Sequence, residues 1–193
     1  MSSVVITGDT SGSVTLSAPA VAGTTTLTLP TANGTIITTG STGQVIPKAA
    51  LPTGSVLQVV TGSTSTSVST NGTTYLDTNL TATITPTSAT SKILVLVSQN
   101  GITKGPGANG AGAKIQLLRG STVLMKIQGY AGYTESTSYN WIGGVSASYL
   151  DSPATTSATT YKTQFGNEQA VAAFVNVNND NSTSTITLLE IAQ

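Results

Sequence analysis

The glycine-rich stretch GPGANG, residues 105–110, has the Gly-x-Gly-x-x-Gly spacing that can bind the pyrophosphate of a dinucleotide. That chemistry needs a helix to begin at the third glycine, because the amide groups at a helix N-terminus hold the phosphates. The residues that follow, AKIQLLRG, favour a strand that soon turns, and no acidic residue lies near the offset that a ribose contact requires. We therefore expect an exposed loop and no nucleotide cofactor.

A second candidate is the oxygen-rich run Asn-Asn-Asp-Asn at 178–181, which could offer ligands to a calcium ion. Calcium prefers several carboxylates, and this run has only Asp180. An ordinary turn before the last strand is the favoured interpretation, and no metal is expected.

Enzyme chemistry has few residues to work with. The sequence has no histidine and no cysteine, which removes the usual general base, the usual zinc ligand and the thiol nucleophile. The acidic residues Asp77, Asp151, Glu135 and Glu168 show no local pairing. A carbohydrate-active enzyme stays open only if two carboxylates meet in the folded chain. We expect a protein that is not an enzyme.

Aromatic residues concentrate in one region, because four of the six tyrosines and the only tryptophan lie between Tyr130 and Tyr149. Period-two spacing predicts a strand whose buried face holds Tyr139, Trp141, Val145, Ala147 and Tyr149. Gly143-Gly144 marks a bulge or bend in that strand. Tyr130 and Tyr133 lie in the glycine-rich GYAGYTES and are not part of this period-two pattern. They are therefore the candidates to face a receptor and stack on sugar rings.

Composition excludes several partners. Seven basic and seven acidic side chains cancel among 193 residues, and clustered positive charge, which nucleic acids and anionic membranes attract, is missing. No apolar run reaches the roughly eighteen residues of a membrane span. The start, MSSVVITGDTSG, lacks the basic and apolar regions of a signal peptide. We expect no nucleic-acid or membrane partner and folding in the compartment where the chain is made.

Residues 54–193 carry repeated strand signals. Strands are expected at VLQVV (56–60), LTATIT (80–85), KILVLVS (92–98), 114–128 as two strands joined at Arg119-Gly120-Ser121, VAAFVNV (171–177) and STITLLEIA (184–192). In LTATIT, Leu80, Ala82 and Ile84 share one face, whereas KILVLVS is apolar on both faces and should be a central strand covered on both sides. The pattern predicts an all-β fold, an antiparallel β-sandwich resembling a jelly roll.

Residues 1–53 form a separate arm and linker. Val14 and Leu16 alternate with polar residues, and TTTLTLPTANGTIITTG (24–40) should form a hairpin around Asn33-Gly34. A unit of this size cannot bury a core of its own, so it must rest either on the second domain of its own chain or on another chain. The predicted contacts to a neighbouring chain are Val14, Leu16, Leu27, Leu29, Ile36 and Ile37. Uncharged sheets with open edges aggregate unless an assembly covers them, so we expect a homotrimer or similar ring.

Two segments together carry a family resemblance. GSVTLSAPAVAGTTTLTLPTANGTIITTG (12–40) resembles the β segment near the attachment end of many tailed-bacteriophage fibre and virion-surface proteins. Residues 54–98, together with QLLRGSTVL (116–124), are similar to a β-sandwich module of the same class. The resemblance implies a virion structural protein that forms homotrimers, and it brings no catalytic residues.

Length separates two versions of that role. A fibre needs a shaft, and here an arm leads directly into one globular module. The leading expectation is a capsid decoration or cement protein on the virion surface, made in the host cytoplasm and anchored to the major capsid protein by its arm. The alternative is a short tail fibre or receptor-binding tip that contacts host-surface glycans through Tyr130, Tyr133 and the 105–112 loop.

Overall fold

The computed structural model describes residues 3–7, 13–17 and 51–193, and the chain divides into two compact units, Met1–Val45 and Ile46–Gln193. In the first unit, β1 (Ser3–Thr7) pairs antiparallel with β2 (Ser13–Ser17). The alternation around Val14 and Leu16 predicted β2, whereas β1 was not predicted. The expected hairpin at 24–40, with Leu27, Leu29, Ile36 and Ile37, lies outside the described residues. The boundary expected near residue 53 stays a prediction.

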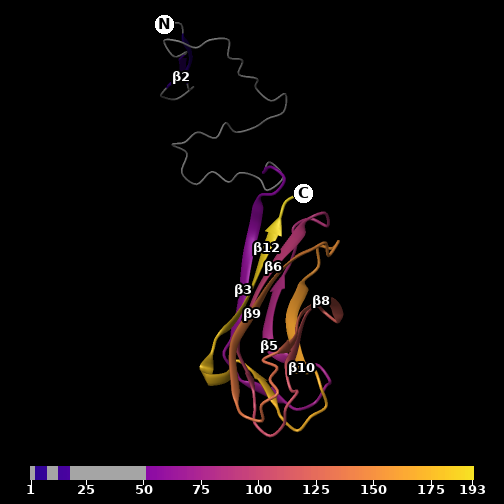
Figure 1. Ribbon diagram of the computed structural model, residues 1–193. Helices are drawn as coiled ribbons and strands as arrows, with labels where there is room; N and C mark the ends of the chain where they lie inside the picture. Colours follow the sequence, from indigo (N-terminus) through magenta and orange to yellow (C-terminus); the bar gives the residue numbers. More distant parts are fainter. Residues whose placement is uncertain (1–2, 8–12, 18–50) are drawn as a thin grey trace. The chain divides into compact units, whose positions relative to one another are not determined.

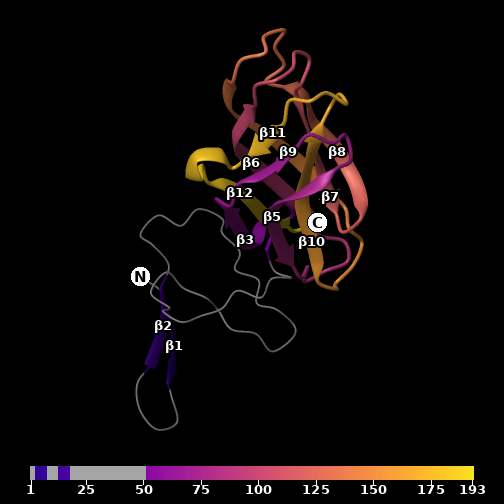
Figure 2. The ribbon, with the colours of Figure 1, turned by 90° about the horizontal axis from the view of Figure 1, so that it is seen from below.

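Strands dominate residues 51–193, and the one helical element described there is the short 3-10 turn η2 (Asn179–Asn181). The strands, most of them labelled in Figure 1 or Figure 2, are β3 (Val56–Thr64), β4 (Val68–Thr70), β5 (Leu76–Ile84), β6 (Lys92–Lys104), β7 (Ala113–Arg119), β8 (Thr122–Ala131), β9 (Asn140–Asp151), β10 (Thr159–Asn167), β11 (Val175–Val177) and β12 (Ser184–Ile191). Among the described residues, no helix is long and apolar enough to cross a membrane.

The eight long strands pair as one nested hairpin: β3 with β12, β5 with β10, β6 with β9 and β7 with β8. Further pairing of β12 with β6 and of β10 with β7 joins these hairpins into two sheets. The first sheet runs β3-β12-β6-β9, with β11 and β4 continuing it beside one end of β6, and the second runs β5-β10-β7-β8. Figure 1 and Figure 2 show the two layers facing each other. This pairing is that of a jelly roll, so the predicted all-β fold is confirmed.

The core lies between the sheets and is built by alternation along the strands. Leu80, Ala82 and Ile84 of β5 are buried on one face, as predicted. They pack with inward residues of the first sheet, such as Ile93 and Val95 of β6. A second cluster fills the other end of the sandwich and contains Ile102, Ala113, Ile115, Ala131, Phe165, Val175 and Val177.

The expectation that KILVLVS is covered on both faces is wrong. Ile93, Val95 and Val97 face the core, but Leu94 is only half-buried and Leu96 is exposed. A sandwich of two layers covers one face of each sheet, and nothing in residues 51–193 lies over the outer face of β6. These leucines therefore remain available to another molecule.

The face predicted for β9 is also partly wrong. Val145 and Tyr149 pack against the core, but Tyr139 is exposed and Trp141 is 61% exposed. The pairing of β9 with β6 shifts register around Gly143, whose φ is +92°. This bulge, which was predicted, adds one residue to the strand and so turns Trp141 to the outer face.

Two further strands differ from expectation. No strand was predicted at β10, although it is a central strand of the second sheet. The segment 171–177 contributes only β11, Val175–Val177.

Candidate functional site

The outer face of the first sheet carries a continuous row of aliphatic side chains. Residues directly opposite in an antiparallel ladder point to the same face. The register places side by side Val59 of β3, Leu189 of β12, Leu94 of β6 and Leu150 of β9. We call these four residues the apolar row; Val59 and Leu150 are exposed, whereas Leu94 and Leu189 are half-buried. Four strands at about 4.8 Å spacing make it roughly 14 Å wide.

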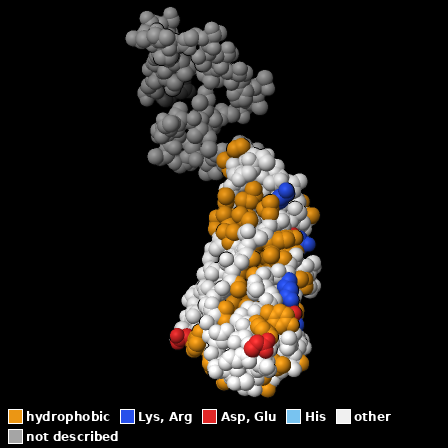
Figure 3. All heavy atoms as spheres, in the orientation of Figure 1, with side chains coloured by type: hydrophobic (Ala, Val, Ile, Leu, Met, Phe, Trp, Pro, Cys, Tyr) orange, Lys and Arg blue, Asp and Glu red, His pale blue; other side chains and the backbone are white. Residues whose placement is uncertain are grey.

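The surroundings of the apolar row are uncharged. The next row along the sheet holds Thr61, Thr187, Leu96 and Ser148, and the one after it holds Ser63, Thr185, Ser98 and Ser146. Among the outward-facing residues described on these four strands, Lys92 at the margin carries the only charge. Figure 3 shows hydrophobic side chains gathered over this sheet, with charged groups at its borders. Such a face can dock on protein without stripping water from unpaired charges.

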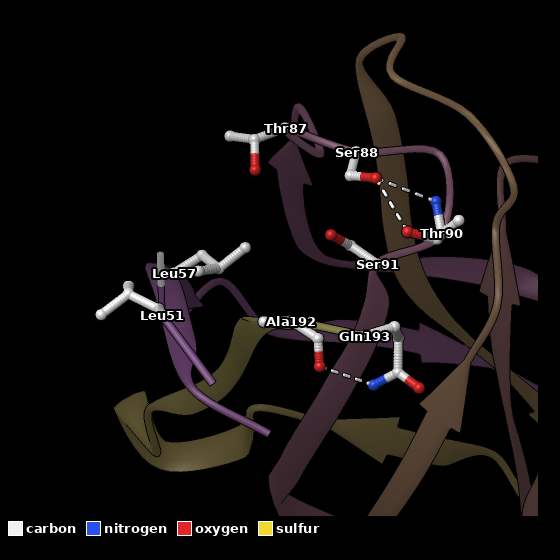
Figure 4. A pocket seen from close by; sticks show the side chains of 8 residues that line it. All are labelled: Leu51, Leu57, Thr87, Ser88, Thr90, Ser91, Ala192 and Gln193. Carbon is white, nitrogen blue, oxygen red and sulfur yellow. Dashed lines mark hydrogen bonds between the residues drawn. The ribbon is translucent and has the colours of Figure 1, made fainter. Parts of the chain in front are cut away.

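A cleft of about 480 Å³ lies at the end of the sandwich where Leu51 and the C-terminus meet. It is lined by Leu51, Leu57, Thr87, Ser88, Thr90, Ser91, Ala192 and Gln193 (Figure 4). Backbone bonds between Gly54 and Ala192 and between Ser55 and Ala192 close this end. None of the described lining residues is titratable, so the cleft offers shape and hydroxyl groups rather than acid–base chemistry. No sequence pattern predicts this cleft, because its lining residues come from separate parts of the chain.

Tyr130 and Tyr133 are exposed, as the sequence analysis expected. Their rings meet edge to face with centroids 5.5 Å apart. Gln169 Nε2 donates to Tyr130 Oη at 3.2 Å, and Tyr133 Oη donates to Glu135. The two tyrosines and Gln169 line a shallow hollow of about 350 Å³. Whether these tyrosines face a receptor stays a prediction.

The glycine-rich segment 105–110 is a loop that leads into β7, as the sequence analysis expected, rather than into a helix. The amide groups of its three glycines are already used, because Gly105 N donates to Phe174 O, Gly107 N to Thr137 O and Gly110 N to Thr134 O. These bonds tie the loop to its neighbours instead of leaving amides for a phosphate.

The run 178–181 forms η2 and serves the fold. Asn178 is fully buried with φ +56°. Its Oδ1 accepts hydrogen bonds from Gln99 Nε2 at 2.8 Å and Ser184 Oγ at 2.5 Å, and its Nδ2 donates to the carbonyl oxygens of Thr66 and Thr78. Within the described residues, no group of three or more acidic side chains gathers to hold a metal.

Two carboxylates are buried and held by partners of their own. Asp151 accepts hydrogen bonds from Arg119 Nη1 at 2.8 Å and from Tyr161 Oη at 2.6 Å. Glu190 accepts from Gln58 Nε2 and from the backbone and hydroxyl of Thr87. Burial alone would raise the pKa of Glu190, but these hydrogen bonds outweigh burial and lower that pKa.

The exposed carboxylates are also paired. Asp77 receives hydrogen bonds from Lys162 and Gln164, and the Lys162 ammonium is the main reason that the pKa of Asp77 is lowered. Glu168 pairs with Lys126 at 3.0 Å. The carboxylates named here therefore bind amides, hydroxyls and cations, and the contacts described do not bring two of them together.

No protein-family model matches the chain, and no curated protein does. Among solved structures, a weak likeness is to the VP2 subviral particle of infectious bursal disease virus, at 11% identity and a TM-score of 0.42, over 72% of this chain. The chain spans 34% of the length of that VP2 chain.

Proposed function

We propose that the protein is a structural component of a bacteriophage virion: a homotrimeric decoration or cement protein that binds the major capsid protein through residues 1–53. The observation that carries the proposal is the uncharged outer face of the first sheet with its apolar row. The resemblance of residues 12–40 and 54–98 to virion-surface proteins of tailed phages supports the same role.

The energetics favour assembly through this face. Completing the burial of each half-exposed aliphatic side chain contributes on the order of 1 kcal/mol, so the apolar row favours association by a few kcal/mol per subunit. Hydroxyl groups beside the row can exchange water for hydrogen bonds across an interface. Because only Lys92 is charged on this described face, little of that gain is lost to desolvating ions.

The N-terminal unit supplies the attachment. A two-stranded hairpin such as β1–β2 is marginally stable alone and gains from pairing with or packing on a neighbour. We assign Val14, Leu16, Leu27, Leu29, Ile36 and Ile37 to that contact. Bridging adjacent capsomers in this way would stabilise the shell against internal pressure. The role is non-catalytic.

The assembly can be tested with two matched charge substitutions. Leu150 in the apolar row and Val123 on β8 of the second sheet are 51% and 52% exposed. Light scattering after size exclusion should give a trimer for the wild type and for Val123→Glu, and a monomer for Leu150→Glu. A monomeric wild type, or an unchanged mass for Leu150→Glu, would contradict assembly through the apolar row.

The attachment needs a separate experiment. Deleting residues 1–50 should leave a soluble trimer that no longer binds empty capsids of the phage that encodes the protein. Unimpaired capsid binding by this truncated protein would overturn the cement role. Copy number gives an independent check, since hundreds per particle indicate the shell and a few dozen or fewer indicate the tail.

A receptor-binding tip is the second candidate, favoured by the exposure of Tyr130 and Tyr133. In that case, Tyr130→Ala with Tyr133→Ala should abolish adsorption to host cells while particles stay intact. Normal adsorption of such particles would argue against it.

A further inference from the structure

A second exposed surface lies at the opposite end of the first sheet. β6 runs from Lys92, which pairs with Ile191 near the C-terminus, to Lys104, which pairs with Asn140. The outer face near Lys104 carries three aromatic side chains, which we call the aromatic strip: Trp141, Tyr139 and Phe174. Tyr139 stacks on Trp141 with ring centroids 5.3 Å apart and planes 28° apart, and it meets Phe174 edge-on at 5.9 Å.

The chain builds this strip with specific residues. A Cβ at Gly105 would lie 2.4 Å from the Phe174 ring, so only glycine lets this ring lie against the backbone directly after β6. The bulge at Gly143 turns Trp141 outward. Fully buried Lys104 donates hydrogen bonds to the carbonyl oxygens of Ser136 and Ser138, which fixes the loop leading to Tyr139. The rings are therefore positioned before any ligand arrives.

The chemistry of the strip suits an uncharged ligand with apolar faces. Trp141 is stacked on one ring face only and is 61% exposed. Thr103 and Asn176 share its register row, and buried Thr103 Oγ1 and Asn176 Oδ1 have no hydrogen-bond partner within the described residues. Both atoms are closed to solvent, so the part of the strip that a ligand can reach is the exposed ring of Trp141 together with Tyr139.

The size of the strip favours a small ligand over a protein. Aromatic side chains carry roughly 150–250 Å² each, so the exposed parts of Trp141 and Tyr139 offer on the order of 250 Å². A stable protein interface needs about 800 Å² per partner. The strip is also separate from the apolar row, because the nine residue steps from Trp141 to Leu150 span roughly 30 Å of strand, and Ser146 and Ser148 lie between them on the same face.

We propose that the aromatic strip is a binding site for neutral saccharides, in which the C–H face of one or two pyranose rings stacks on Trp141 and Tyr139. The sugar hydroxyls keep their hydrogen bonds to water, because Thr103 Oγ1 and Asn176 Oδ1 are buried. The site is independent of the virion role, and it is distinct from the Tyr130–Tyr133 pair.

The only tryptophan of the chain lies in this site, so the full-length wild-type protein reports on its own binding. We would titrate it with maltohexaose, cellohexaose, mannohexaose and chitohexaose while following tryptophan emission and heat. At least one oligosaccharide should give a saturable emission change with a matching calorimetric isotherm. No saturable signal with any of the four at millimolar concentration would overturn the proposal.

Variants localise the site. Trp141→Ala should weaken calorimetric binding at least tenfold, Trp141→Phe should restore most of it, and Tyr139→Leu should weaken it too. Leu76→Ala is the matched control, because Leu76 of β5 and Tyr139 are similarly exposed, at 41% and 42%, and Leu76 lies in the other sheet. Loss of binding in Leu76→Ala with retention in Trp141→Ala would overturn the assignment.

Light scattering and fluorescence quenching test whether the strip contacts a protein instead. Trp141→Ala should keep the mass of the wild type in light scattering, and acrylamide should quench Trp141 fully in the assembled protein. A changed mass, or a tryptophan shielded from acrylamide without saccharide, would show that the strip is a subunit interface instead. Because capsid binding is assayed separately, failure here leaves the cement proposal standing, and the reverse also holds.

Discussion

Replacing Tyr161 with phenylalanine tests a buried polar link between the two sheets. Tyr161 of β10 is fully buried, and its Oη donates to Oδ2 of Asp151 on β9 at 2.6 Å. Arg119 of β7 donates to both oxygens of the same carboxylate at 2.9 and 2.8 Å. One carboxylate of the first sheet thus joins two strands of the second.

The expected loss follows from what phenylalanine retains. The ring still fills its place in the core, so no cavity forms, and Asp151 keeps Arg119. What disappears is one hydrogen bond to a charged acceptor, worth about 1.5–3 kcal/mol. For a unit of this size the change lowers Tm by roughly 5–10 °C. Asp151→Ala should cost more, about 3–5 kcal/mol, because it leaves a cation and a buried hydroxyl without their partner.

The assay is urea unfolding of the full chain at one fixed protein concentration, since assembly contributes to apparent stability. Tyr139→Phe is the control, because the Tyr139 side chain is exposed and its change should fall within about 0.5 kcal/mol. If Tyr161→Phe matches the wild type within that margin, or if Asp151→Ala costs no more than Tyr161→Phe, the link does not stabilise the sandwich as argued.

Three further expectations follow from buried groups. Burial is the main cause that raises the pKa of Tyr161, and the Asp151 carboxylate raises it further. The stability that Tyr161 contributes is therefore complete below the unfolded pKa of about 10 and declines at higher pH. In urea unfolding between pH 9 and 11, Tyr161→Phe should show a smaller decline than the wild type. The pKa of Glu190 is lowered in the fold, so the carboxylate contributes stability above its unfolded pKa, and this stability is lost as pH falls. Glu190→Gln should therefore be less stable than the wild type at pH 7 and should lose less stability between pH 5 and pH 3. A Cβ at Gly62 would lie 1.9 Å from the backbone oxygen of Thr81, so Gly62→Ala should lower the free energy of unfolding by about 2 kcal/mol. The control Gly72→Ala should leave that free energy nearly unchanged, because the nearest atom to a Cβ at Gly72 is 3.5 Å away.

Period-two alternation predicted much of the sandwich because inward positions there are aliphatic. β10 was missed because its inward positions include Thr163 between Tyr161 and Phe165. Thr163 can be buried because its hydroxyl donates to Gln99 and shares a hydrogen bond with Thr78, two residues from strands distant in the sequence. A buried threonine cannot be told from an exposed one until those partners are known.

The apolar row was invisible for a different reason. Each strand contributes one member, and only the register between strands places Val59, Leu189, Leu94 and Leu150 together. The single local signal was KILVLVS, whose second apolar face was assigned to a covering layer within the chain. Residues 51–193 supply no such layer, so the leucines of that face point to assembly instead.

The aromatic strip shows how one inserted residue decides between a core and a surface. Without the bulge at Gly143, Trp141 would share the inward face of Val145 and Tyr149, and the predicted burial would hold. With it, Ile142 turns inward to the core and Trp141 turns outward beside Tyr139. A bulge gives up ladder hydrogen bonds, and exposing the only tryptophan gives up burial of the largest side chain in the chain. Both changes lower the stability of the isolated domain, and neither is offset by packing within it. We therefore assign the exposed ring to ligand binding.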